Sequence, residues 1–136
     1  NPELKTRFTL SLTAEERTRS RHRFSSDEGE PLELQLPRGT VLRDRDLLCV
    51  ASGDVWVRVK AKPEPVLTVT ATTPLALLKA AYHLGNRHVP LEVTPAYLRL
   101  SPDSVLEQLL VQLGVAVAAE VVPFQPEVGA YSHSHS

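Results

Sequence analysis

The stretch that decides the fold is Ala80-Ala81-Tyr82-His83-Leu84-Gly85-Asn86-Arg87-His88-Val89-Pro90, where a helical pattern ends and an extended pattern begins. An apolar helical run over residues 74–84 leads into it. Gly85-Asn86 are residue types that tolerate the left-handed conformation that closes a helix, so we predict that they form its last turn. Pro90 cannot continue a helix and favours extended backbone before it. His88 is therefore predicted to be the first residue past a tight corner, on a rigid backbone.

The patterns on both sides of this corner predict strands and helices in the order βαββαβ. Thr73-Pro74 and Ser101-Pro102 are each expected to place an N-cap and a first-turn proline at a helix start. The expected elements are a strand at 66–71, the helix at 74–84, strands at 91–94 and 96–100, a helix from 102 to 113, and a strand at 115–122. This is the ferredoxin-like order, with two helices on one face of a four-stranded sheet. Many unrelated functions share that fold, so it identifies none of them.

The first half of the chain has the two-residue period of short strands. Alternation predicts an all-β domain of five or six strands, among them 8–12, 32–36, 47–51 and 55–59. Ser52-Gly53-Asp54 predicts a hairpin between the last two of these strands. Thr13 with Glu16 three residues later resembles a capping box, for which we expect only a short turn. Cys49 is predicted to be a small buried hydrophobe in its strand, and a metal ligand is the alternative.

Proline-rich sequence separates the two halves. Residues 60–65 contain two prolines with one residue between them, which predicts a stiff extended spacer. We therefore expect an N-terminal β domain at 1–62 and a ferredoxin-like domain at 63–136. Apolar periodicity stops after Val122, so residues 123–136 are predicted to form a flexible, histidine-bearing tail.

Composition excludes several classes of protein. A hydrophobic fraction of 42% in 136 residues is enough for one core or two small ones. No uninterrupted apolar run approaches the roughly 18 residues of a membrane span. No signal peptide is visible, although the chain begins at Asn1 rather than Met. The single cysteine rules out an internal disulfide and fits a reducing cytoplasm, so we expect a cytoplasmic protein without a membrane partner.

Charge argues against nucleic acid as a partner. The formal net charge is −1, and no aromatic side chains alternate with the arginines at 17, 19, 21 and 23. In a strand these arginines would share one face. A solvated sheet face is the leading interpretation, with a protein-binding patch and nucleic-acid binding as alternatives. Residues 63–136 are acidic and contain four of the five histidines, a setting that attracts a divalent cation.

The histidines form the candidate metal site. His133 and His135 would point to one side of an extended tail, about 7 Å apart, and a solvated tail or an expression remnant is the alternative interpretation. His88 of one subunit supplies only one metal ligand, which is too few to hold an ion. Two copies of His88 that face each other across a two-fold axis would supply two ligands. Imidazole ligands suit Ni(II), Cu(II) or Zn(II). His83 is interpreted as a polar group at the helix end, or as a secondary ligand or orienting partner.

Four stretches of the chain resemble the UreE family of urease accessory proteins, the nickel metallochaperones. They occur in the family's order and the resemblance covers nearly the whole chain: Leu36-Pro37-Arg38-Gly39-Thr40-Val41-Leu42-Arg43-Asp44, Tyr82-His83-Leu84-Gly85-Asn86-Arg87-His88-Val89-Pro90, Pro102-Asp103-Ser104-Val105-Leu106-Glu107 and Pro123-Phe124-Gln125-Pro126-Glu127.

The resemblance implies a function as well as a fold. It implies a peptide-binding type of N-terminal domain, a metal-binding ferredoxin-like domain, and a homodimer formed through the latter. The expected role is delivery of Ni(II) to the urease apoprotein together with an accessory GTPase, without enzymatic activity. His88 matches the family's shared metal histidine, and His133 and His135 correspond to its tail ligands. Some relatives have a histidine at the position of Ser104, so no auxiliary site is expected there.

Two functions of other classes are alternatives to this one. A ferredoxin-like module that senses a small molecule would use Gly85-Asn86 as a ligand contact and would need no metal. A metal-dependent hydrolase would need a general base and a closed pocket around the metal. Glu92 lies near the corner, but no HExxH spacing occurs.

Overall fold

The computed structural model describes residues 6–49 and 55–127. The chain divides into two compact units, Asn1–Lys62 and Pro63–Ser136. No helix in the described ranges has the length and apolar character needed to cross a membrane.

The first unit is built mainly from short strands. Its three-stranded sheet has the order β1-β5-β4, in which β5 pairs parallel with β1 and antiparallel with β4, and a second sheet pairs β2 with β3 antiparallel. The strands are β1 (Thr6–Leu12), β2 (Arg21–Ser25), β3 (Pro31–Gln35), β4 (Leu47–Cys49) and β5 (Trp56–Ala61). Inward side chains of these strands, together with Leu42 from the loop between β3 and β4, form one apolar core: Leu10, Leu12, Leu34, Leu42, Val57 and Val59. The β4–β5 pairing agrees with the expected hairpin, whose turn lies outside the described residues.

The predicted capping box is confirmed. The Thr13 N–H donates to the Glu16 carboxylate at 2.9 Å, and the Glu16 N–H donates to the Thr13 hydroxyl at 3.3 Å. The helix that follows is the single 3-10 turn η1 (Glu16–Thr18).

Two expectations for the first unit are wrong. Arg17 lies in η1, is only 4% exposed and donates through Nε to the Leu12 carbonyl, so the arginines do not share one sheet face. The helical turn at Glu16–Thr18 breaks the strand pattern that the expectation assumed. Cys49 is exposed rather than buried, because in β4 the half-buried residue is Leu48 and its neighbours face outward.

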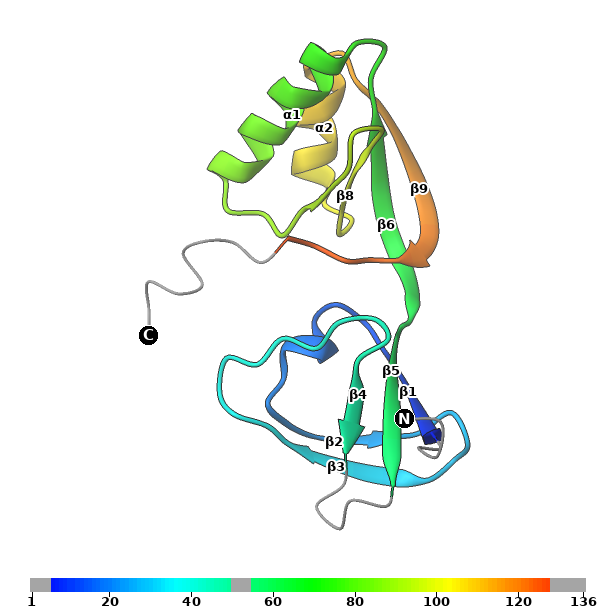
Figure 1. The fold of residues 1–136 in the computed structure, drawn as a ribbon. Helices are drawn as coiled ribbons and strands as arrows, with labels where there is room; N and C mark the ends of the chain where they lie inside the picture. The colour runs from blue at the N-terminus through cyan, green and yellow to red at the C-terminus, as the bar shows by residue number, and fades with distance from the viewer. Residues whose placement is uncertain (1–5, 50–54, 128–136) are drawn as a thin grey trace. The chain divides into compact units, whose positions relative to one another are not determined.

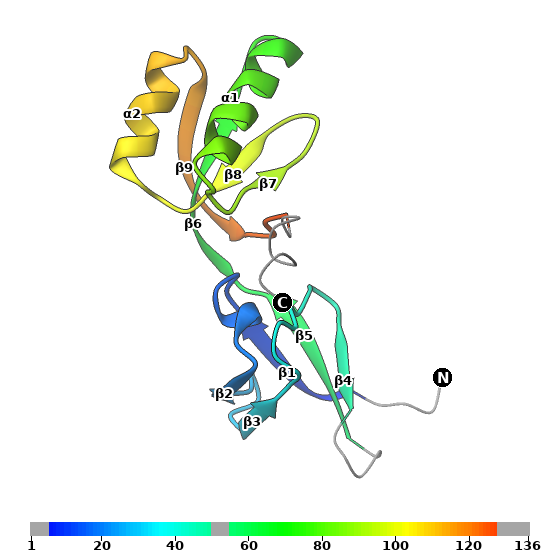
Figure 2. The same cartoon turned by 90° about the vertical axis from the view of Figure 1, so that its left-hand side faces the viewer.

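The second unit places two helices on one face of a four-stranded antiparallel sheet (Figures 1 and 2). The strand order is β7-β8-β6-β9. The elements are β6 (Pro63–Thr70), α1 (Pro74–Asn86), β7 (Glu92–Val93), β8 (Leu98–Leu100), α2 (Ser104–Gln112) and β9 (Ala116–Pro123). The core between the helices and the sheet includes Leu67, Val69, Leu77, Ala80, Leu84, Leu98, Leu100, Leu106 and Leu110.

The predicted proline spacer is part of this sheet. Pro63 and Pro65 lie in β6 and pair in register with Pro123 and Val121 of β9. The other neighbour, β8, pairs only with residues 67–69 of β6. The prolines therefore lie beyond the β8 pairing, where a strand tolerates the missing N–H donors.

Local capping sets where the helices begin. Thr73 is the N-cap of α1, as predicted, and its hydroxyl accepts from the Ala76 N–H at 3.1 Å. The N-cap of α2 is Asp103 rather than Ser101, because the Asp103 carboxylate accepts from two N–H groups of the first turn, at 2.9 and 3.0 Å.

The prediction of a flexible tail beginning at 123 is wrong for residues 123–127. Pro123 ends β9, and the Phe124 side chain is only 2% exposed. The Gln125 N–H donates to Glu92 Oε1 and the Glu127 N–H donates to the Leu91 carbonyl, both at 2.8 Å. Buried Phe124 and these two hydrogen bonds hold the segment in place, although its sequence has no apolar periodicity.

Candidate functional site

The histidine corner lies where α1 ends. Gly85 and Asn86 are helical residues of α1, so the prediction that they form the left-handed turn is wrong. The left-handed residue is His88 itself, with φ 59°. Its N–H donates to the Gly85 carbonyl at 3.0 Å, and the next N–H, of Val89, donates to the Leu84 carbonyl at 3.4 Å. These two bonds are the pair that defines a Schellman motif, with His88 at the position glycine usually occupies.

Burial of the residues around His88 explains this geometry. Leu84 is fully buried in the core and Val89 packs against the same core. A hydrophobic contact across the motif is the usual partner of its two hydrogen bonds. His88 lies between these anchors with an exposed side chain. The left-handed conformation costs a residue with a Cβ roughly 1–2 kcal/mol of conformational free energy. Residues held in such conformations are enriched at functional sites.

A hollow of about 390 Å³ opens beside this corner. Its lining is mostly apolar and comes from α1, the corner, the end of β7 and the C-terminal segment: Ala81, Gly85, His88, Val89, Pro90, Leu91, Val93 and Glu127. Among these lining residues, His88 and Glu127 have side chains that can ligate a metal. Sequence reasoning missed Glu127, because it follows the last strand and only the docking of residues 123–127 carries it to the corner.

The other predicted ligands are not placed in this hollow. His83 lies in the last turn of α1, is half-buried and contacts the Tyr82 ring edge-on, with centroids 5.2 Å apart. It is not among the residues that line the hollow. His133 and His135 lie outside the described residues. Within 6–49 and 55–127, no three His, Cys, Asp or Glu side chains form a group that could hold a metal ion.

A polar network ties together the strands of the second unit. Arg99 in β8 donates through Nε to the Thr68 hydroxyl at 3.1 Å and stacks over the Tyr97 ring at 4.1 Å. Its guanidinium also lies 3.7 Å from the Glu92 carboxylate and 3.8 Å from that of Glu120. Glu92, which bonds Gln125, is thus connected to β6, β8 and β9 at once.

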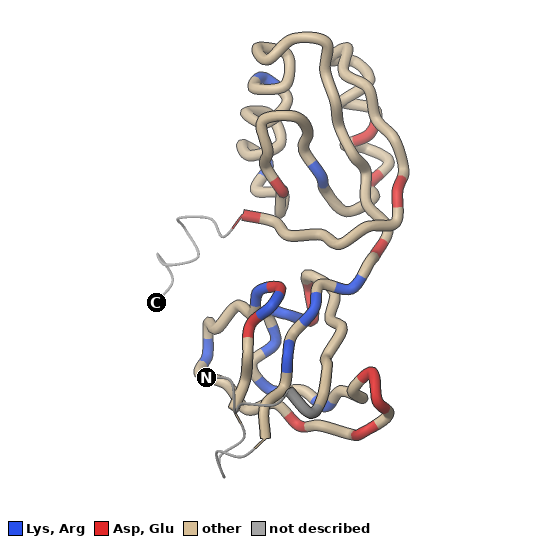
Figure 3. The backbone as a smooth tube through the Cα atoms, turned by 45° about the vertical axis from the view of Figure 1, so that its right-hand side comes forward, with Lys and Arg blue, Asp and Glu red and all other residues tan. Residues whose placement is uncertain are grey.

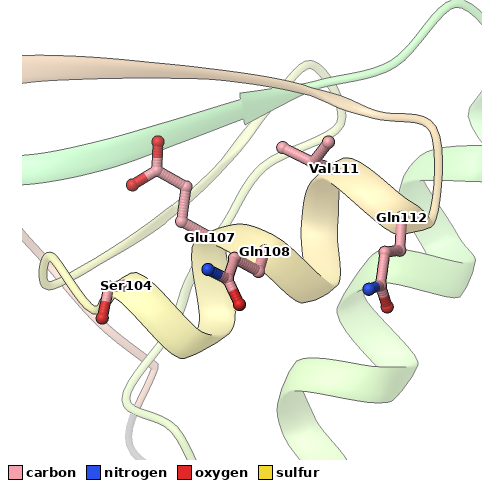
Figure 4. Close-up of a pocket in the computed structure, with 5 residues that line it drawn as sticks. All are labelled: Ser104, Glu107, Gln108, Val111 and Gln112. Carbon is pink, nitrogen blue, oxygen red and sulfur yellow. The ribbon is translucent and has the colours of Figure 1, made fainter.

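A second hollow, of about 420 Å³, runs along the outer side of α2 (Figure 4). It is lined by Ser104, Glu107, Gln108, Val111 and Gln112. The lining contains one carboxylate and no imidazole, so it does not match the chemistry of a transition-metal site. Figure 3 shows that Lys and Arg gather in the first unit, whereas the second unit has few of them. The corner hollow is therefore the better metal candidate.

Comparisons with known proteins identify the family of both units. The profile described as "UreE urease accessory protein, N-terminal domain" matches residues 1–62, and that described as "UreE urease accessory protein, C-terminal domain" matches residues 64–136. A urease accessory protein UreE from Nostoc sp. is 57% identical over 99% of this chain and 92% of its own length. One from Nostoc punctiforme is 61% identical over 94% of this chain and 86% of its own length. One from Burkholderia lata is 50% identical over 93% of this chain and 61% of its own length.

These matches define the chain first as a urease accessory protein, because both units and nearly the full length are covered. Within that class, the chain belongs to the UreE family.

Proposed function

We propose that this protein is a nickel metallochaperone that binds Ni(II) and delivers it for assembly of the urease active site. The observation that supports this most is the exposed, left-handed His88 at a hydrogen-bonded corner in a UreE-family chain. The protein acts on its partners by binding and release, in the cytoplasm, and not as an enzyme. Family membership does not favour a small-molecule sensor or a metal-dependent hydrolase.

The donor set supports a loosely held ion. His88 and Glu127 offer two donors, whereas divalent transition metals take four or more. A second His88 from a partner subunit and the tail residues His133 and His135 would complete the set, with His83 as a secondary ligand. Ligands contributed by two different segments of the chain would allow stepwise exchange, as delivery requires. Zn(II) and Cu(II) would compete for the same nitrogen ligands.

An apolar stripe on α1 supports a homodimer through the second unit. Leu75, Leu78 and Tyr82 follow helical spacing and are 60%, 66% and 68% exposed. The stripe runs along the helix that ends at the His88 corner. A second copy of this chain that covers the stripe would bury it and bring two corners together.

We infer that residues 63–136 form a ferredoxin-like domain, supported by the βαββαβ order and by the sheet order β7-β8-β6-β9. Residues 1–62 would form a separate domain that binds extended peptide of a partner. A groove of about 460 Å³ supports this: its lining comes from the region of the edge strands β3 and β4 and from Val57 of β5, and four of its eight lining residues are leucines. The urease apoprotein and its accessory GTPase are the proposed partners.

Titration of the full chain with Ni(II), followed by native mass spectrometry and calorimetry, tests the function. We expect a dimer with Ni(II) bound, and in His88→Ala a loss of affinity of about 100-fold or more, because each dimer loses two ligands. His22→Ala in the first unit is the matched control and should bind as wild type. Full affinity in His88→Ala would refute the corner as the site.

A urease activation assay tests the role of the first domain. A chain lacking residues 1–62 should retain Ni(II) binding, because the corner and tail are intact, but should activate urease less. Equal activation by the truncated chain would exclude a function for residues 1–62 in delivery.

A further inference from the structure

β9 is the long edge strand of the second unit. The sheet order β7-β8-β6-β9 places it at one edge, where it pairs antiparallel with β6 along its whole length. In the part of the chain that the structure describes, no strand pairs with its other side. Figure 1 shows β9 along the outer side of the unit. A strand paired on one side only directs the N–H and C=O groups of alternate residues outward, where a second extended chain can bond to them.

The two edges of this sheet differ in how they are protected against such pairing. β7, the edge strand after the His88 corner, has two residues, whereas β9 has eight. Short length, lysines and prolines are usual means of keeping a sheet edge from pairing. β9 contains no lysine, and its proline is its last residue. Six of its eight residues are exposed, and only Glu120 among them is charged, so β9 presents a long and mainly apolar edge.

α2 widens this edge into a larger surface. The helix packs against β9, and its residues Glu107 and Val111, one turn apart, line the hollow of Figure 4. Val111 is 62% exposed, and Val121 of β9 is 67% exposed. Val121 shares one face of β9 with Val117, which packs against the core under the helices, so Val121 lies on the helix side of the sheet. We call Glu107, Val111, Val121 and the outer edge of β9 the α2–β9 surface.

The opposite face of β9 carries its one charge. Glu120 alternates with Val121, and its carboxylate lies 3.8 Å from Arg99, with 41% of the side chain exposed. A strand added beside β9 would therefore meet an apolar side chain on the helix side and a carboxylate on the other. Alternating apolar and basic side chains fit that arrangement.

The charge of the surrounding sequence favours a basic partner over a second copy of this chain. Residues 101–127 contain no Lys, Arg or His, and their charged residues are Asp103, Glu107, Glu120 and Glu127. An acidic surface attracts basic segments and repels acidic ones. Two β9 strands paired antiparallel at full overlap would place their Glu120 side chains opposite or diagonal to each other, which is destabilising.

We propose that the α2–β9 surface binds an extended segment of a partner protein in which basic side chains alternate with apolar ones. The segment adds another strand to the sheet, and its backbone bonds to the outer edge of β9. Its apolar side chains cover Val111 and Val121, and its basic side chains meet Glu120. The surface lies at the sheet edge opposite β7, and this binding does not require metal at the His88 corner.

Fluorescence anisotropy with a labelled peptide tests the surface in the full chain. The probe alternates lysine and valine and matches β9 in length. We expect it to bind at least about tenfold more tightly than a matched peptide of glutamate and valine. Val121→Lys should weaken binding of the probe about tenfold or more, because it removes an apolar contact and repels the peptide's lysines. Val105→Lys is the matched control, since Val105 is equally exposed but lies on a different side of α2 from Val111, and it should bind as wild type.

Amide hydrogen exchange, measured by NMR, tests whether the peptide bonds to the backbone of β9. The β9 amides that do not bond to β6 should exchange at least about tenfold more slowly when the lysine–valine peptide is bound. This readout distinguishes strand addition from attraction of the peptide to the acidic surface, which would leave those amides unprotected.

Several outcomes would overturn the proposal. They are no binding of the lysine–valine peptide, equal binding of the two peptides, full affinity in Val121→Lys, and binding without protection of the β9 amides. Protection of these amides in protein without peptide that disappears on dilution would instead identify a second copy of this chain as the occupant.

Discussion

His88 and Gly114 occupy the same position in two copies of one helix-ending motif. After α2, the Gly114 N–H donates to the Val111 carbonyl at 3.0 Å and the next N–H donates to the Leu110 carbonyl at 3.3 Å, matching the pair of bonds after α1. The left-handed residue is Gly114 in one motif, with φ 83°, and His88 in the other, with φ 59°. The second unit therefore contains the glycine solution to this geometry and, at its candidate site, a histidine in its place.

His88→Gly should be more stable than His88→Ala, although both variants remove the corner ligand. Glycine adopts positive φ without the Cβ clash, so we expect the free energy of unfolding to rise by about 1 kcal/mol relative to His88→Ala, which keeps the clash. Urea unfolding of both variants without metal measures the difference.

Gly114→Ala is the matched control for this prediction. It introduces a Cβ at the equivalent left-handed position and should destabilise by about 1 kcal/mol, while leaving Ni(II) affinity unchanged. If His88→Gly and His88→Ala unfolded at the same urea concentration, the proposed strain at His88 would be absent.

Removing residues 131–136 should weaken Ni(II) binding without unfolding the protein. The deletion removes His133 and His135 but leaves the docked segment 123–127 in place. We expect a loss of about tenfold or more in affinity by calorimetry, because two tethered ligands are lost. Thermal unfolding without metal should be unchanged. Unaltered affinity and stoichiometry would show that the tail takes no part.

Leu78→Glu should disrupt the homodimer. A charge in the middle of the exposed α1 stripe would be buried without a partner on association, which costs several kcal/mol. Sedimentation should show monomers, and Ni(II) should bind more weakly because the dimer is lost. Val105→Glu, at an exposed valine of α2, is the control and should remain dimeric. A dimeric Leu78→Glu protein would place the interface elsewhere.

Acid should weaken the first unit through Glu28. The Thr9 N–H donates to the Glu28 carboxylate at 2.8 Å, and this hydrogen bond holds the pKa of Glu28 below its ordinary value of 4.5. A pKa that is lower in the folded state stabilises the fold above the unfolded pKa, and the contribution disappears as pH falls through the folded value.

Glu28→Gln tests this dependence, because it cannot titrate. Urea unfolding of both proteins between about pH 7 and about pH 3 should show a shallower loss of stability in the variant below the ordinary glutamate pKa. Parallel curves for the two proteins would contradict the role of Glu28.

Local patterns predicted most of the elements. The alternation around Leu32–Leu36, the Thr73 cap with Pro74, and the Thr13–Glu16 box depend on neighbours in sequence, and the structure contains each of the features they predict. His88 could be singled out from sequence because Pro90 and the end of the apolar helical pattern mark a corner. The same residues carry the resemblance to the UreE family, and the matches to both family domains confirm that resemblance.

Long-range packing decided the rest. Burial of Leu84 and Val89 in one core moved the left-handed position from Gly85-Asn86 to His88, against the intrinsic preference of glycine. Glu92 and Leu91 hold residues 123–127, from more than thirty positions away in sequence, and bring Glu127 to the corner. Sequence by itself determined the elements and the corner, because caps and periodicity are local. Only tertiary structure decided what surrounds His88, because buried apolar area and hydrogen bonds between distant segments outweigh local propensity.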